Sequence, residues 1–189
     1  MIEKYNIVGK IFKNKKSLEF IVINKTHKNA KSVQLYDVRF IKSGFIAHNI
    51  SSGHIRNGEV KDYFSPSVFN VGCLGYAYGY AKRNESRRIY YTWRNMLRRC
   101  YDKKYRAYKW YGAQGIVVCE RWKRLDYFIE DIKKIDGFNL EKFENGLIEL
   151  DKDIKSTDIK YYSLETCTFV DHGTNNREAL NRRWNKTKH

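Results

Sequence analysis

The sequence lacks long hydrophobic runs and contains a single proline among its 189 residues. No run approaches the roughly 18 apolar residues of a membrane-spanning helix, and the first residues contain no apolar block typical of a signal peptide. We therefore expect no membrane partner, and we expect the protein to remain in the cytoplasm. A chain of this length can form one large core or two small domains without disulfides or a structural metal.

Closely spaced cysteines are also missing. Cys73, Cys100, Cys119 and Cys167 lie far apart, and no C-x-x-C pair occurs. This spacing argues against a zinc knuckle and against a dithiol redox motif. In a reducing compartment such cysteines are expected to be small buried apolar residues.

Acidic residues are scarce relative to basic ones. The chain has 37 Lys and Arg against 21 Asp and Glu, a formal net charge of +16. A charge of this size attracts polyanions, and nucleic acid is the expected partner. More than half of the excess lies in residues 81–110, which carry 11 basic and 2 acidic residues. A local excess of this kind can neutralise phosphates in one place.

The first third of the chain has the pattern of β-strands. Residues 20–23 form a short apolar run, and residues 36–40 alternate apolar and charged side chains, as a half-buried strand does. Asn57-Gly58 is a hairpin signal. We predict an α+β protein that begins with a small antiparallel β-sheet domain, residues 1–65, with a role in DNA binding.

A linker is predicted next, followed by a second domain. Residues 66–85 contain the proline and several glycines, which favour a linker. Residues 86–189 are predicted to form an HNH-like domain with a basic helix, a short strand near residues 116–119 and a second helix over residues 125–134. The final part of this domain is predicted to be a ββα unit of the metal-binding type.

The basic helix is amphipathic. From Ser86 onward, apolar residues recur at helical spacing, whereas most arginines fall on other faces. We expect four large side chains in and after this helix to lie in the core, with stacking on bases as the alternative: Trp93, Met96, Trp110 and Trp122. The residues that we predict to bind nucleic acid are Arg87, Arg88, Arg94, Arg98, Arg99, Lys103, Lys104, Lys109, Arg182 and Arg183.

Polar residues gather where a short strand ends near the C-terminus. Residues 147–150 lead directly into Asp151-Lys152-Asp153, and residues 167–170 form a second strand before a helix that ends near Trp184. If this ββα unit closes, the carboxylate of Asp151 and the side-chain oxygen of Asn175 face one another. Two such oxygens suit Mg²⁺ or Mn²⁺, which can polarise a scissile phosphate.

Four segments carry a resemblance to a known family. They are residues 92–101 (TWRNMLRRCY), 111–122 (YGAQGIVVCERW), 151–153 (DKD) and 162–170 (YSLETCTFV), followed by Asn175. The chain resembles the HNH homing-endonuclease-like proteins of bacteriophages over roughly residues 86–185. This resemblance implies a ββα-metal, or His-Me finger, nuclease that cuts or nicks double-stranded DNA with one divalent ion, Mg²⁺ or Mn²⁺.

The resemblance also implies residue roles. Asp151 matches the metal-binding carboxylate of the first strand, and Asn175 matches the final ligand. Lys152 stands where these nucleases carry the histidine that activates water, and Thr166 stands in place of the loop-fixing asparagine. A lysine beside Asp151 and Asp153 stays charged and is a poor base. His172, Lys152 and Asp153 are the remaining candidate catalytic residues, with His172 or a metal-bound water supplying the base.

Plainer interpretations remain open at each position. Asp151-Lys152-Asp153 can be a solvated strand end, and His172 and Asn175 can simply cap a helix. A second function keeps the fold without the chemistry, as a non-catalytic nucleic-acid-binding or host-modulating phage protein that acts on DNA or on a host protein. A third, an RNA binder, depends on charge alone.

Overall fold

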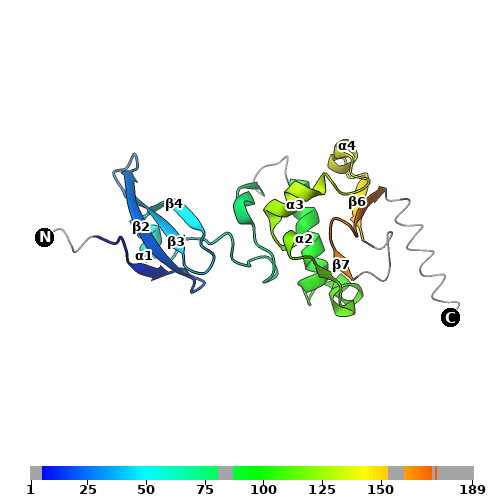
Figure 1. Ribbon diagram of the computed structural model, residues 1–189, viewed down its shortest axis with the longest axis horizontal. Helices are drawn as coiled ribbons and strands as arrows, with labels where there is room; N and C mark the ends of the chain where they lie inside the picture. The colour runs from blue at the N-terminus through cyan, green and yellow to red at the C-terminus, as the bar shows by residue number, and fades with distance from the viewer. Residues whose placement is uncertain (1–5, 81–86, 153–159, 172, 174–189) are drawn as a thin grey trace. The chain divides into compact units, whose positions relative to one another are not determined.

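The computed structural model describes residues 6–80, 87–152, 160–171 and 173 (Figure 1). The chain divides into two compact units, residues 1–65 and residues 66–189. The first contains an antiparallel sheet and the second mixes helices with short strands. The predicted α+β class is therefore confirmed. Within the described ranges, no helix combines the length and the apolar character that crossing a membrane requires.

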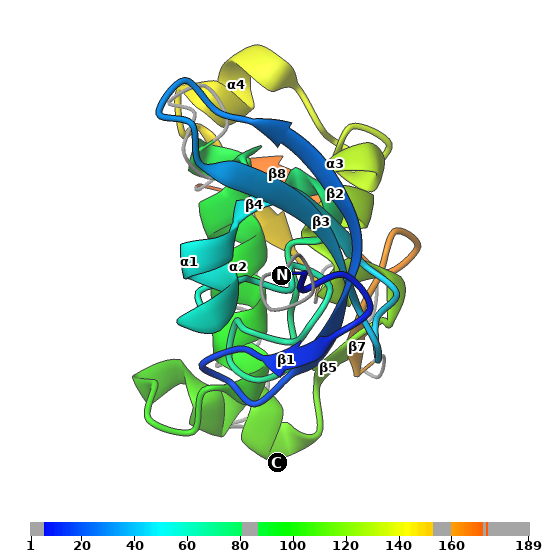
Figure 2. The same cartoon turned by 90° about the vertical axis from the view of Figure 1, so that its left-hand side faces the viewer.

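The first unit is built on a four-stranded antiparallel sheet with the strand order β1-β2-β3-β4. Its elements are β1 (Ile11–Lys13), β2 (Glu19–Lys28), β3 (Gln34–Phe40), β4 (Ile46–Ser51) and the helix α1 (Ser52–Arg56). In Figure 2, β2 and β3 run side by side as long, strongly curved strands. Irregularities in their register after Val22 and after Lys25 accompany this curvature.

Alternation along the strands explains the core of this unit. Phe20 pairs with Phe40 and Val22 pairs with Val38 across β2 and β3, and all four side chains are buried. Ile55 of α1 joins the same cluster. Because successive side chains of a strand point to opposite faces, these apolar residues share the inner face of the sheet.

The second unit surrounds the helix α2 (Arg87–Tyr101). Its other helices and strands are β5 (Val117–Val118), α3 (Leu125–Ile132), α4 (Leu140–Glu144), β6 (Ile148–Asp151), β7 (Tyr161–Tyr162) and β8 (Thr168–Asp171). Short 3-10 helices cover Gly75–Ala77, Arg106–Trp110, Gly112–Gln114 and Arg121–Lys123. The predicted basic helix and the second helix both occur, the latter ending two residues earlier than expected.

Two tryptophans lie at the centre of this unit. Trp93 of α2 and Trp122 have relative exposures of 0% and 1%, and Trp93 Nε1 donates a hydrogen bond to the carbonyl oxygen of Trp122 at 2.7 Å. Trp122 also meets Phe128 of α3 edge to face, with ring centroids 5.1 Å apart. The apolar stripe of α2 thus packs against α3, and the core positions expected for Trp93, Met96 and Trp122 are confirmed.

The segment predicted as a linker is packed onto the second unit as far as it is described, to residue 80. Cys73 donates its N–H to Lys123 and accepts the N–H of Leu125, both at 3.0 Å. Val68, Phe69 and other apolar side chains of the segment pack against the core. The glycine and proline content predicts a linker. Burial of these apolar side chains is more favourable than their exposure to water, so the described part of the segment packs against the core instead.

Two short strand pairs complete the second unit. β6 and β8 are antiparallel, with Leu150 opposite Phe169 and Asp151 opposite Thr168, whereas β5 and β7 are parallel. The two strands predicted for the ββα unit are thus present and adjacent. The helix predicted to follow them lies outside the described residues, apart from Gly173.

Candidate nucleic-acid interface and strand-end site

Asp151 is the last residue of β6. It stands opposite Thr168 in the β6–β8 pair, and it is half-buried at the strand end where the sequence predicts a metal ligand. Five other residues predicted for this site or for its surroundings lie outside the described part of the chain: Asp153, His172, Asn175, Arg182 and Arg183. The facing arrangement of Asp151 and Asn175 therefore remains a prediction.

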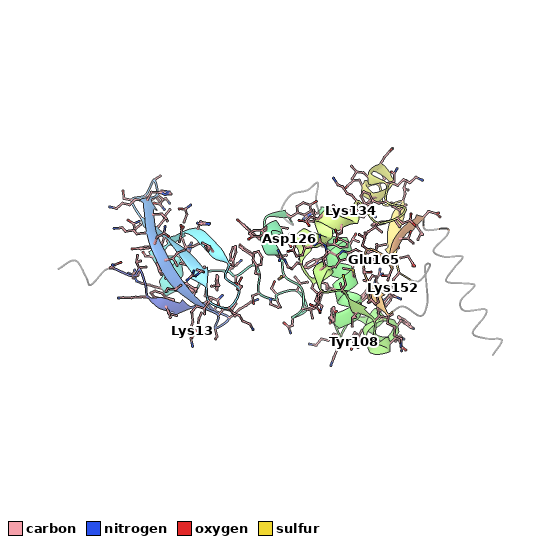
Figure 3. The ribbon with its side chains drawn as sticks, in the orientation of Figure 1. Lys13, Tyr108, Asp126, Lys134, Lys152 and Glu165 are labelled. Atoms are coloured by element: carbon pink, nitrogen blue, oxygen red, sulfur yellow. The ribbon has the colours of Figure 1, made fainter. Side chains whose placement is uncertain are left out.

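Lys152 lies in the interior of the second unit. Its relative exposure is 3%, and Figure 3 labels it near β7, below Glu165. Burial raises the pKa of Cys100 to about 12 and that of Cys167 to about 11, and in both cases the positive charge of Lys152 opposes part of this increase. The Lys152 ammonium is thus close enough to act on both thiols, and it is not on an open surface.

Thr166 fixes the loop between β7 and β8. Its hydroxyl oxygen accepts the N–H of Ser163 at 2.9 Å and donates to the carbonyl oxygen of Tyr161 at 2.8 Å. The side chain is buried, so both hydrogen bonds are shielded from water. Thr166 therefore joins two parts of the loop at the position where the resemblance implies a loop-fixing asparagine.

A groove of about 400 Å³ runs between α2 and β6. Its walls come from α2, α4, β6 and β7, and the lining residues are Arg87, Arg88, Tyr91, Thr92, Asn95, Met96, Arg99, Phe143, Ile148, Glu149, Leu150 and Tyr162. Three arginines and one glutamate line this space, so the groove is positively charged. It lies on the strand that ends in Asp151.

The arginines of the groove differ in their surroundings. Arg87 is exposed at the start of α2. Arg88 lies over the ring of Phe143, 5.4 Å from its centroid, and its Nε is buried without a hydrogen-bond partner among the described residues. Arg99 lies 5.4 Å from the ring centroid of Tyr111. Burial alone lowers the pKa of Arg99, but Tyr162 and Tyr111 outweigh it and the pKa is raised.

Two other arginines of α2 contact neighbouring residues of the same unit. Arg98 Nε is 3.3 Å from a carboxylate oxygen of Asp102, and its guanidinium carbon lies 4.2 Å from the ring centroid of Tyr105. Arg94 lies 5.1 Å from the ring centroid of Phe69. These side chains stabilise the unit, and periodicity alone could not distinguish them from arginines that are open to a ligand.

The segment that follows α2 carries several exposed basic side chains. We name residues 102–110 the basic loop. Its Lys103, Lys104, Arg106 and Lys109 are exposed, and no ion pair between described residues involves them. Trp110 is 59% exposed, with Lys109 Nζ 4.1 Å from the centroid of its ring system. The expectation that Trp110 lies in the core is therefore wrong, because the 3-10 turn from Arg106 directs it outward.

The described residues supply only part of the predicted metal site. Across residues 6–80, 87–152, 160–171 and 173, no group of three or more His, Cys, Asp or Glu side chains could hold a metal ion. Asp151 offers a hard oxygen ligand of the kind that Mg²⁺ and Mn²⁺ prefer. The second predicted ligand, Asn175, lies beyond the described ranges.

Comparisons with family models, with curated proteins and with solved structures found no match. The resemblance to phage HNH proteins thus depends on the four sequence segments and Asn175, and the function is inferred from the chemistry of the site.

Proposed function

We propose that the protein binds duplex DNA and cleaves it as a divalent-metal-dependent endonuclease of the HNH type. The observation that carries this proposal is the basic groove between α2 and β6, which borders the strand that ends in Asp151. The arginines of α2 thus line a groove beside the strand that carries the candidate metal ligand.

DNA binding is supported by the placement of charge. Arg87 and Arg88 line the groove, and the basic loop adds exposed lysines at the other end of the same helix. Contacts between basic side chains and phosphates supply most of the affinity of non-specific DNA binding and fix the position of a protein on the duplex. The groove and the basic loop together offer such contacts at both ends of α2.

Hydrolysis is supported by the strand end. A divalent ion held by the Asp151 carboxylate would polarise the scissile phosphate and stabilise the leaving oxygen. The β6–β8 pair fixes the backbone at Asp151, and Thr166 fixes the loop that leads into β8. In this proposal Asn175 is the second metal ligand and His172 is the general base. Asp153 is the neighbouring carboxylate.

A second function is favoured by Lys152. Its side chain is buried at the position where the family resemblance implies a water-activating histidine. A side chain that is 3% exposed has little access to the water molecule that a general base activates. The second candidate is therefore a protein that keeps DNA binding and has no cleavage activity.

Plasmid relaxation distinguishes the two. The assay compares the wild-type protein with Asp151→Ala, His172→Ala and Lys152→Met in Mg²⁺ and in Mn²⁺, and Glu144→Ala serves as a control that removes an exposed acid of α4. Nicking that disappears in Asp151→Ala and persists in Glu144→Ala is the expected result. Full activity of Asp151→Ala would refute the assigned site. Salt-sensitive duplex binding without cleavage would identify the second function, and stronger competition by structured RNA than by duplex DNA would refute both.

A further inference from the structure

We infer that Trp110 stacks on a nucleobase of the bound DNA, while the lysines and the arginine of the basic loop contact the flanking phosphates. This inference rests on the proposed DNA binding and adds a base-contacting residue to it. It is independent of whether the strand-end site cleaves.

The surroundings of Trp110 differ from those of the other described tryptophans. Trp93 and Trp122 are buried and have hydrogen-bond partners for their indole nitrogens, whereas more than half of the Trp110 surface is open. A large aromatic ring gains free energy when it leaves water, so an open ring is a favourable contact surface for a partner.

The local structure holds Trp110 at the end of a defined turn. The 3-10 helix Arg106–Trp110 is joined to the next turn by the side-chain amide of Gln114, which donates to the carbonyl oxygen of Lys109 at 3.1 Å. Gly112 lies against Cys100 and the ring of Tyr108, where a Cβ would have no space. Figure 3 labels Tyr108 in this part of the unit. The backbone on both sides of Trp110 is thus fixed.

The positive charge of the basic loop indicates an anionic partner. Lys103, Lys104 and Arg106 are exposed, and the acidic residue of the loop, Asp102, is already engaged by Arg98. An exposed aromatic ring among basic side chains is the combination by which proteins bind single-stranded or unpaired nucleic acid, because unpaired bases stack on the ring while phosphates contact the charges. An apolar protein surface would not compensate these charges.

Lys109 provides a reason for the orientation of the ring. Its ammonium lies 4.1 Å from the centroid of the Trp110 ring system, a cation–π contact. Lys109 is itself exposed, so the contact is formed at the surface. The ammonium can move to a phosphate when a base takes its place on the ring.

The first test measures affinity for fluorescein-labelled duplexes that are fully paired or contain a short unpaired bubble. Trp110→Ala should weaken binding to the bubble duplex on the order of 10-fold and binding to the fully paired duplex by less, whereas Trp110→Phe should remain within about threefold of wild type because it keeps a ring. Tyr76→Ala removes another open aromatic side chain elsewhere in the unit and should have no effect.

Salt dependence separates stacking from phosphate contact. Trp110→Ala should lower affinity at every salt concentration without changing the slope of log affinity against log salt, since it removes no charge. A slope that changes as in a lysine variant would contradict stacking. Thermal unfolding should be unchanged in Trp110→Ala, because its side chain is exposed.

Quenching of tryptophan emission provides a second measurement. The emission that DNA quenches in the wild-type protein and not in Trp110→Phe belongs to Trp110, because Trp93 and Trp122 are buried and Trp184 is present in both proteins. Wild-type affinity of Trp110→Ala on both duplexes would overturn the inference and leave DNA binding intact. Absence of duplex binding by the wild-type protein would instead refute the proposed function, and preference for RNA would identify a different nucleic acid as the partner.

Discussion

Arg121 donates two hydrogen bonds to the carboxylate of Asp131, from Nε at 2.7 Å and from a terminal guanidinium nitrogen at 3.1 Å. The same carboxylate accepts the indole N–H of Trp122 at 3.1 Å. The Asp131 side chain is only 4% exposed, so its charge is compensated inside the unit. This carboxylate joins α3 to the turn that carries the central tryptophan.

Replacement of this carboxylate should destabilise the second unit. Asp131→Asn places an amide N–H₂ against groups that are themselves donors and leaves Arg121 with only the exposed Glu130 as an acidic partner, at an expected cost of about 2–4 kcal/mol. All four tryptophans belong to the second unit, so their emission during urea unfolding reports on that unit. Glu130→Gln removes the other, 56% exposed partner of Arg121 and should cost less than about 1 kcal/mol. Equal destabilisation by the two substitutions would contradict this assignment.

Low pH should lower the stability of the second unit. Burial alone raises the pKa of Asp131, but hydrogen bonds from Arg121 and Trp122 and the charge of Arg121 outweigh it, so the pKa lies below its usual value. For Asp126, the effect of burial is likewise outweighed, by Arg124 and by the N–H of Tyr76, and its pKa is lowered.

A carboxyl whose folded pKa is depressed stabilises the fold above the pKa of the unfolded chain, about 3.9 for Asp. This contribution disappears as pH falls through the lower folded pKa. The urea midpoint of the second unit should therefore decrease below about pH 4 and change little between about pH 5 and 7 on account of these groups. In Asp131→Asn the urea midpoint should decrease less at low pH. If it decreased as much as in the wild-type protein, Asp131 would not contribute to the acid sensitivity.

A close backbone approach at Gly137 should make this glycine irreplaceable. Its φ is +74°, and an added Cβ would lie against the carbonyl oxygen of Phe169, with the carbonyl carbon at 3.2 Å. The preceding residue, Asp136, accepts the N–H of Phe169 at 2.8 Å, so the backbone cannot withdraw without breaking the contact with β8. We expect Gly137→Ala to cost about 3 kcal/mol or more.

Gly115 is the matched control for that substitution. Its φ is +80°, but the nearest atom to an added Cβ is Cδ of Lys160 at 3.9 Å. Gly115→Ala should therefore cost only the backbone penalty of about 1 kcal/mol. Urea unfolding followed by tryptophan emission measures both variants. Similar destabilisation would mean that backbone strain, and not the approach to Phe169, determines the effect.

Much of the fold could be predicted because its signals are local. The stripe from Ile89 to Cys100 has helical period, and residues 36–40 alternate, so α2 and β3 follow from side-chain spacing. The β6–β8 pair also follows from two short apolar runs that end in polar residues. Three of the cysteines, Cys73, Cys100 and Cys167, are buried as expected.

The site could be predicted only in part, because long-range contacts determine which charges are open. Arg98 and Arg99 have the same charge and the same local sequence, yet one meets Asp102 and the other lies beside Tyr162 and Tyr111. Tyr162 lies 63 residues after Arg99 in the sequence and gives no local signal. Its residue type predicts a core position for Trp110, but the 3-10 helix Arg106–Trp110 directs the side chain to the surface.

Salt dependence should distinguish open charges from engaged ones. Lys103 and Lys104 are exposed in the basic loop, so their joint replacement by Ala should reduce the slope of log affinity for duplex DNA against log salt by about 0.9 for each phosphate that the protein no longer neutralises. Arg98→Ala should change this slope little and lower stability instead, because Arg98 is paired with Asp102 and packs on Tyr105. Fluorescence anisotropy between about 50 and 200 mM salt measures the slope.

The control for the lysine pair is a double variant of equal charge. Lys133 and Lys142 are exposed lysines of the same unit, outside the basic loop and the groove. Their joint replacement by Ala removes the same amount of positive charge and should leave the slope nearly unchanged, because phosphate contact depends on position and not on net charge. If both double variants reduced the slope equally, the interaction would be a long-range attraction spread over the whole unit, and the basic loop would have no special role.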